Sequence, residues 1–154
     1  MELSDLDDLY RDGILDHCRN PRNSAVLGDP DATARAVNAF CGDEVDVQLV
    51  FENGLLADIG VQSSGCSINQ AASSMLSEAL DDKTLEDAES LASLFKRMMG
   101  GDVLTEDELG SLGDLRALAG VLQFPVRIKC ALLSWSALEE AVEMLRTRQV
   151  SPEA

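Results

Sequence analysis

The sequence predicts an α+β fold, in which a small three-stranded antiparallel sheet packs against several helices. Two observations predict it. Before residue 62, apolar and polar residues alternate in two stretches, which is the period of a strand; after Gly65, apolar residues recur every three or four positions, which is the period of a helix. Strands that come first and helices that follow are the α+β order. With 154 residues, 45% of them hydrophobic, we expect one domain over residues 1–154.

A first helix is predicted from Ser4 to about Cys18. Ser4 can accept from free backbone amides, and the aspartates that follow it suit the positive end of the helix dipole. Apolar residues then recur at helical spacing, namely Leu6, Leu9, Tyr10 and Ile14. The stretches 20–23 (Asn-Pro-Arg-Asn) and 28–30 (Gly-Asp-Pro) are typical of a loop.

Two strands joined by a tight turn are predicted next. Residues 44–51 alternate between polar and apolar side chains. Asn53 and Gly54 then form a pair that tolerates the positive φ angles of a hairpin turn. The returning strand is expected to place one set of side chains on a single face: Leu55, Ala57, Ile59 and Val61. An earlier run, 34–40, is predicted to be a third strand at the sheet edge.

Past Gly65 the sequence predicts two longer helices. The face of the first comprises Ile68, Ala72, Met75 and Ala79. Thr84, with Asp87 three residues later, caps the second, which the glycines at 100 and 101 end. Its apolar stripe comprises Ala88, Leu91, Ala92, Phe95 and Met98.

Three further helices complete the predicted order. Thr105 and Glu108 form a capping box for a short helix. Leucines at 112, 115, 118 and 122 predict another. Pro125 begins the last helix, because its fixed φ suits the first helical position. The inward face of that helix comprises Ala131, Trp135, Leu138, Val142 and Leu145, and we expect fraying from Gln149.

The charge balance excludes two classes of partner. Twenty-eight acidic and twelve basic residues give a formal charge of −16, which repels nucleic-acid phosphates and anionic lipid. No apolar run approaches the roughly 20 residues that span a bilayer, and the first residues lack the features of a signal peptide. We therefore expect a cytoplasmic protein, in which cysteines more often bind metal or act as nucleophiles than form disulfides.

Three of the four cysteines lie where chemistry is plausible. Cys41 is followed by a flexible Gly42 and by the carboxylate of Asp43, and Cys66 lies at a strand–helix junction, where free amides favour a thiolate. Cys130 lies early in the last helix. Three sulfurs and one carboxylate suit tetrahedral zinc. The chain has no CxxC pair, however, and cysteines are often inert buried residues, so spacing alone leaves both interpretations open.

Four ordered motifs carry more information. They are Asp16-His17-Cys18-Arg19-Asn20-Pro21-Arg22-Asn23, then Cys41-Gly42-Asp43, then Ser64-Gly65-Cys66-Ser67-Ile68 followed by Ala72-Ser73-Ser74-Met75, and finally Val126-Arg127-Ile128-Lys129-Cys130-Ala131. Through them the chain resembles the U-type iron–sulfur cluster assembly proteins, the group that contains IscU and the NifU amino-terminal domain. The resemblance extends from about residue 7 to residue 145 and implies the IscU/SufE-like fold.

Within this family the chain is most similar to the SufU branch. Residues 100–120 resemble the insertion of that branch, and Lys129 stands where the scaffold branch has a histidine. The stretch 122–126 (Leu-Gln-Phe-Pro-Val) also departs from the chaperone-docking motif Leu-Pro-Pro-Val-Lys of the scaffold branch. Cys18 replaces a common aromatic residue and is interpreted as a spare, partly buried thiol.

The resemblance implies a zinc-dependent sulfurtransferase. Residues matching the family's zinc ligands are Cys41, Asp43, Cys66 and Cys130. Proteins of this branch accept persulfide sulfur from a SufS-type, pyridoxal-phosphate-dependent cysteine desulfurase and pass it to the downstream iron–sulfur assembly machinery. Cys41 matches the acceptor, which is released when a histidine of the desulfurase takes its place on zinc. Arg127 and Lys129 are predicted to offset the negative charge of the site.

Two other functions remain in competition with sulfur transfer. One is a scaffold on which the same cysteines hold a 2Fe–2S cluster; the other is a structural zinc module without turnover. Lys129 and the 100–120 insertion favour sulfur transfer over the scaffold. Elsewhere, His17, the only histidine, is predicted to be a capping or surface residue, and the acidic run 106–108 a solvated face.

Overall fold

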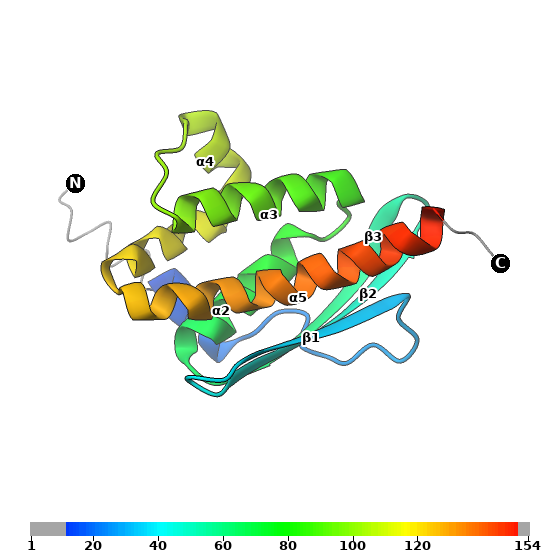
Figure 1. Ribbon diagram of the computed structural model, residues 1–154, viewed down its shortest axis with the longest axis horizontal. Helices are drawn as coiled ribbons and strands as arrows, with labels where there is room; N and C mark the ends of the chain where they lie inside the picture. Colours follow the sequence, from blue (N-terminus) through cyan, green and yellow to red (C-terminus); the bar gives the residue numbers. More distant parts are fainter. Residues whose placement is uncertain (1–11, 151–154) are drawn as a thin grey trace.

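The computed structural model describes residues 12–150 (Figure 1). It begins with a helical segment at residues 12–19, which is the second half of the predicted first helix; the predicted cap Ser4 and the apolar positions up to Tyr10 lie outside the described residues. The elements that follow are β1 (Ala32–Asn38), β2 (Asp43–Glu52), β3 (Leu55–Ser64), α2 (Ser67–Ala79), α3 (Leu85–Met99), α4 (Glu106–Leu112), the 3₁₀ helix η1 (Gly113–Gln123) and α5 (Pro125–Val150).

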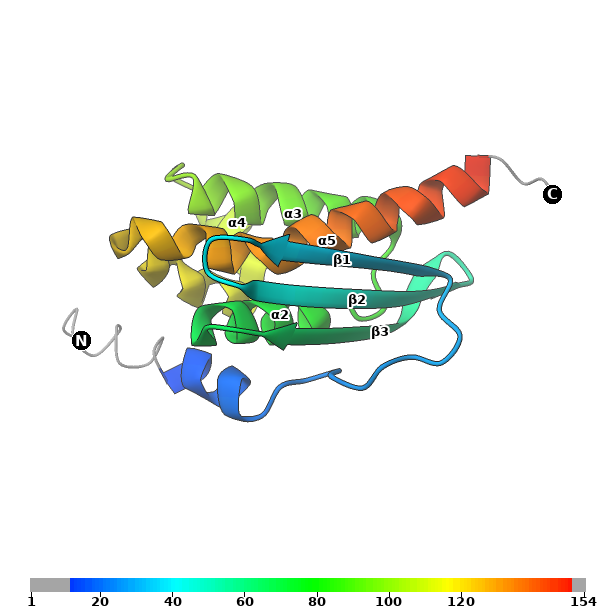
Figure 2. The ribbon, with the colours of Figure 1, turned by 60° about the horizontal axis from the view of Figure 1, so that its bottom comes forward.

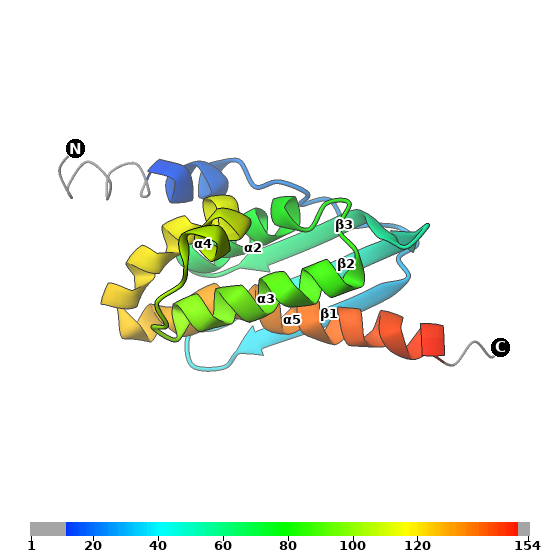
Figure 3. The same cartoon turned by 90° about the horizontal axis from the view of Figure 1, so that it is seen from above.

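The predicted α+β architecture is confirmed. The three strands form an antiparallel sheet in the order β1-β2-β3, so β1 is an edge strand, as the sequence indicated. Helices α2 and α5 pack on one face of the sheet, and α3 packs against α5 on the side away from the strands (Figures 2 and 3). The core lies between the sheet and this helical layer. No helix among residues 12–150 combines the length and hydropathy needed to cross a membrane.

The strand register differs from the predicted one at the hairpin. Asn53 and Gly54 have φ angles of 54° and 80° and form the expected turn. A bulge between Val50 and Phe51 shifts the pairing, so Leu56 is buried while Ala57, which simple alternation would turn inward, is exposed. One extra residue in a strand reverses which face the preceding side chains occupy.

The leucine-rich stretch after α4 is a 3₁₀ helix, not the α-helix that ordinary spacing suggests. From Leu112 at the end of α4, buried residues recur every third position at Leu115, Leu118 and Val121, and Ala117 is buried beside them. This spacing matches the three residues per turn of a 3₁₀ helix, in which every third side chain lies on the same face. Leu122, which the sequence placed on this stripe, is only half-buried.

The other helices agree closely with the prediction. Thr84 Oγ1 accepts from Asp87 N–H, and Thr105 with Glu108 makes a complete capping box. The predicted stripe of α3 and the inward face of α5 are all buried. Helix α5 continues to Val150, past the predicted fraying point at Gln149.

Candidate metal and thiol site

Three cysteines from separate parts of the chain meet at one end of the sheet. Cys41 lies in the loop between β1 and β2, Cys66 is the N-cap of α2, and Cys130 is in the second turn of α5. The β1–β2 loop and the first turns of α2 and α5 lie at this same end of the molecule (Figure 2). Antiparallel pairing brings the loop beside the end of β3, where α2 begins.

The three thiols surround a single carboxylate. Asp43, the first residue of β2, is only 2% exposed. One of its oxygens and the sulfurs of Cys41 and Cys130 all lie within 4.8 Å of one another. Cys66 is outside this mutually close group, but its Sγ is 3.4 Å from Asp43 Oδ2. The structure thus brings together all four residues that the sequence nominated.

A close backbone approach fixes Asp43. The backbone N–H of Cys66 donates to Asp43 Oδ1 at 3.0 Å. Gly65 makes this possible, because a Cβ at residue 65 would lie 1.9 Å from that oxygen, and its φ of 120° is one that side-chain-bearing residues rarely adopt. The glycine before Cys66 is therefore required both for the turn and for space.

Asn69 and Gln70 hold the strand–helix junction around Cys66. The side-chain amide of Asn69, fully buried, donates to Ser64 O at 3.1 Å and to Glu44 O at 3.4 Å, which ties α2 to the ends of both β2 and β3. Gln70 Nε2 donates to Gly65 O at 3.0 Å. The position of Cys66 is thus set by side chains of its own helix.

The Asp43 carboxylate and the Cys130 thiol shift each other's pKa values. Burial tends to raise the pKa of Asp43, but the Cys66 amide and the thiols of Cys130, Cys66 and Cys41 donate to the carboxylate, and the net pKa is lowered. Burial, with Cys66 and Asp43 as neighbours, raises the pKa of the Cys130 thiol far above its ordinary value. A bound cation removes this penalty, because it stabilises every negative ligand at once.

The site opens into a cavity with an apolar and basic rim. The cavity has a volume of about 690 Å³ and includes Arg127 and Lys129 in its lining, where the sequence placed them. The sequence did not single out Phe40, which is 95% exposed and lies under the Lys129 ammonium, 5.8 Å from the ring centre. An aromatic residue directly before the loop cysteine was the only available signal for it. Cys41 itself is exposed, so a partner can reach it.

Cys18 and His17 are not members of this ligand group. Cys18 is half-buried and its thiol donates to Ser67 O at 2.9 Å, as suits a spare thiol. His17 is not the capping or surface residue predicted: it is 4% exposed, and its Nδ1 is 2.7 Å from Ser74 Oγ. Burial and the nearby Arg22 lower the pKa of His17, so the imidazole is neutral at pH 7. A sequence pattern does not show that two distant segments pack over this histidine.

Comparison with known families gives a match over most of the chain. The model of the NifU-like N-terminal domain matches residues 9–152. A zinc-dependent sulfurtransferase SufU from Bacillus subtilis is 42% identical over 90% of this chain and 92% of its own length. An iron–sulfur cluster assembly scaffold protein IscU from Streptococcus pyogenes is 36% identical over 93% of this chain and 88% of its own length.

A solved structure agrees with these matches. The crystal structure of an iron–sulfur cluster assembly scaffold protein for the SUF system, from Fervidobacterium islandicum, superposes with a TM-score of 0.76 at 28% identity. The match covers 84% of this chain and 93% of that one. The fold and the family therefore rest on both sequence and structure.

Proposed function

Because the chain belongs to the NifU-like N-terminal domain family, we propose that it is a zinc-dependent sulfurtransferase that accepts persulfide sulfur from a SufS-type cysteine desulfurase for iron–sulfur cluster assembly. One observation carries the proposal: three thiols from separate elements converge on a buried carboxylate, and one of them, Cys41, is exposed. The likeness to the SufU protein of Bacillus subtilis supports this reaction. The proposed reaction also needs cysteines that are not in disulfides, and a reducing cytoplasm keeps them in this state.

The donor set fits zinc. Zinc accepts thiolate and carboxylate ligands in tetrahedral geometry, in which ligand atoms lie roughly 3.5–3.8 Å apart. The atoms of Cys41, Asp43 and Cys130 lie within 4.8 Å of one another and need a contraction of about 1 Å to reach this spacing. Cys66 already lies 3.4 Å from Asp43 and has to approach the other sulfurs. When bound, zinc keeps its thiol ligands deprotonated at neutral pH and adds no redox chemistry.

Cys41 is the proposed sulfur acceptor. Its thiolate attacks the terminal sulfur of the partner's cysteine persulfide, which forms a new S–S bond on Cys41 and breaks the partner's S–S bond. The partner cysteine leaves as a thiolate, so the exchange is balanced without an external oxidant or reductant. Among the three cysteines, Cys41 suits this role because it is on an exposed loop, while Cys66 is half-buried and Cys130 is buried.

Arg127 and Lys129 offset the negative charge of the thiol site. Both line the cavity beside Cys130, and both are exposed. Three thiolates and a carboxylate exceed the charge of one divalent cation, and a persulfide on Cys41 is a further anion. The guanidinium and ammonium groups offset this charge, which favours the anionic product.

A scaffold for a 2Fe–2S cluster is the second candidate function. The same cysteines suit iron, and several relatives, among them those from Streptococcus pyogenes and Fervidobacterium islandicum, are named scaffold proteins. Lys129 weighs against it, since a lysine beside the last cysteine offers a cation where a scaffold would use a further ligand.

The test combines metal analysis with a desulfurase assay. The protein is purified with its native metal, and cysteine turnover by a SufS-type desulfurase is measured with the wild type, Cys41→Ala and Cys18→Ala. Cys18→Ala is the matched control, because it makes the same substitution at a cysteine outside the ligand group. We expect about one zinc per chain and stimulation that Cys41→Ala abolishes and Cys18→Ala retains.

Each contrary outcome overturns a different part. A stable iron–sulfur chromophore without stimulation of the desulfurase would replace sulfur transfer with the scaffold function. Stoichiometric zinc with no stimulation by the wild type would leave a structural zinc module. Stimulation that survives in Cys41→Ala would show that another thiol accepts the sulfur.

A further inference from the structure

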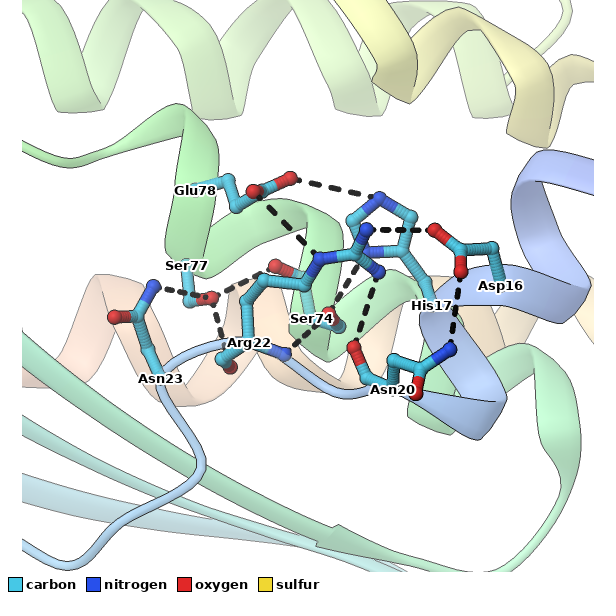
Figure 4. A network of polar contacts seen from close by, with 8 residues as sticks. All are labelled: Asp16, His17, Asn20, Arg22, Asn23, Ser74, Ser77 and Glu78. Atoms are coloured by element: carbon cyan, nitrogen blue, oxygen red, sulfur yellow. Dashed lines mark hydrogen bonds and ion pairs between the residues drawn. The ribbon is translucent and has the colours of Figure 1, made fainter.

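A second polar site lies along the second half of α2, where Ser74, Ser77 and Glu78 face the segment 16–23 (Figure 4). Its centre is the buried His17, whose Nε2 faces Glu78 Oε1 of α2 at 3.5 Å. Asp114, near the start of η1, completes a group in which one imidazole nitrogen and two carboxylate oxygens all lie within 4.8 Å of one another. The three residues come from three separate elements and line one cavity of about 410 Å³. None of them takes part in the proposed sulfur transfer.

From this convergence we propose that His17, Glu78 and Asp114 bind a divalent transition-metal ion. One imidazole and two carboxylates suit manganese, iron(II) or zinc, and three protein ligands leave further positions to water. Glu78 and Asp114 are exposed at the cavity mouth while His17 lies at its base, so an ion can enter from solvent.

The hydrogen bonding of His17 favours an ion at Nε2. Ser74 Oγ lies 2.7 Å from Nδ1 and also accepts from the backbone N–H of Arg22 at 2.9 Å. When Nδ1–H donates to Ser74, the Nε2 lone pair faces two carboxylates, an arrangement that a cation between them stabilises. In the opposite tautomer Nε2–H meets Glu78 at 3.5 Å, which is long for a hydrogen bond. Metal-binding histidines usually donate their second nitrogen in this way.

The surrounding charges are compatible with one divalent ion. Asp16 is paired with Arg22, whose Nη2 lies 2.6 Å from Asp16 Oδ2, and Arg22 Nε is 3.7 Å from Glu78 Oε2. Arg116 also lines the cavity. Arg22 approaches Glu78 through the second carboxylate oxygen, so the oxygen that faces His17 stays available to an ion.

The test uses Mn²⁺ on the full chain with zinc already bound at the thiols. Mn²⁺ prefers oxygen and nitrogen ligands to thiolates, so it probes the second site selectively. The concentration of free Mn²⁺ is measured from its electron paramagnetic resonance signal. The midpoint temperature of thermal unfolding is measured with and without Mn²⁺. The variants are Asp114→Asn and Glu78→Gln, which keep size at exposed positions, with Asp107→Asn as a matched control on α4.

We expect one Mn²⁺ per chain, with affinity reduced about ten-fold or more in Asp114→Asn and Glu78→Gln and unchanged in Asp107→Asn. Mn²⁺ should also raise the thermal midpoint of the wild type but not of Asp114→Asn. Absence of binding at millimolar Mn²⁺ overturns the proposal, and so does equal weakening in all three variants, which would indicate diffuse attraction to an acidic surface. Zinc content at the thiols is measured separately, so this result is independent of the proposed sulfur transfer.

Discussion

The two ends of α2 hold two sites of different construction. At its N-terminus, Cys66 joins two other thiols around one carboxylate, and the polar contacts of these thiols are mainly with Asp43. In its second half, Ser74, Ser77 and Glu78 contact the 16–23 segment through a dense set of hydrogen bonds and ion pairs (Figure 4). Weakly bonded sulfurs can exchange a ligand or accept a sulfur at little cost, whereas the polar network fixes one conformation. Changes in the first region should therefore alter zinc content, whereas changes in the second should leave zinc content unchanged.

The largest expected effect is that of Gly65→Ala at the thiol site. The added Cβ would collide with Asp43 Oδ1, and the φ of 120° adds strain. We expect the free energy of unfolding to fall by roughly 2–5 kcal/mol, and zinc content to fall well below one per chain. Gly101→Ala is the control, because its φ of 94° carries similar strain with nothing within 4 Å of the added atom. Metal analysis measures the zinc content, and urea unfolding measures the stability. A zinc content of one per chain in Gly65→Ala would contradict the close contact.

A smaller effect is expected from Ser74→Ala in the polar network. Its hydroxyl oxygen contacts both the buried His17 Nδ1 and the half-buried Arg22 N–H, and the variant leaves both groups without this partner. Urea unfolding should show a loss of about 1–3 kcal/mol with zinc content unchanged. Ser73→Ala is the matched control: Ser73 Oγ is buried and lacks a hydrogen-bond partner among residues 12–150, so its removal should be neutral or stabilising. Equal losses in the two variants would refute the assigned role of Ser74.

The smallest effect concerns Glu108, remote from both sites. Two donors lower the pKa of the Glu108 carboxyl below the ordinary 4.5: the backbone N–H of Thr105, which has the larger effect, and the guanidinium of Arg97. A lowered pKa stabilises the fold above pH 4.5, and this stabilisation is lost as pH falls through the folded-state pKa. Glu108→Gln should therefore be slightly less stable than the wild type at pH 7, with the difference vanishing in acid. Glu106→Gln, in the same helical turn, controls for net charge; a difference that persists at low pH would exclude the linkage.

Caps, stripes and turns were predictable because each depends on residues a few positions apart. The capping box at Thr105, the stripe of α3 and the Asn53-Gly54 turn agree with the structure for this reason. The bulge before Phe51 was not predictable, since it depends on pairing with another strand. The 3₁₀ helix could have been found from its three-residue period, which differs only slightly from that of an α-helix.

The candidate thiol site was likewise predictable only in part from the sequence. Its four residues were nominated by the family motifs, and the resemblance, not spacing alone, favoured zinc over inert buried cysteines. Their meeting point, the space that Gly65 leaves for Asp43 and the exposure of Cys41 follow from the packing of β2, α2 and α5.

The sequence by itself determined the α+β order, most element boundaries and the chemical nature of the thiol ligands, because these depend on local periodicity and on side-chain type. Only the tertiary structure decided that His17 is buried, that it faces Glu78 and Asp114, and that an open cavity lies beside Cys130. Burial and convergence are properties of segments distant in sequence. Their relative positions are set by the packing of the whole core and are not encoded in any local pattern.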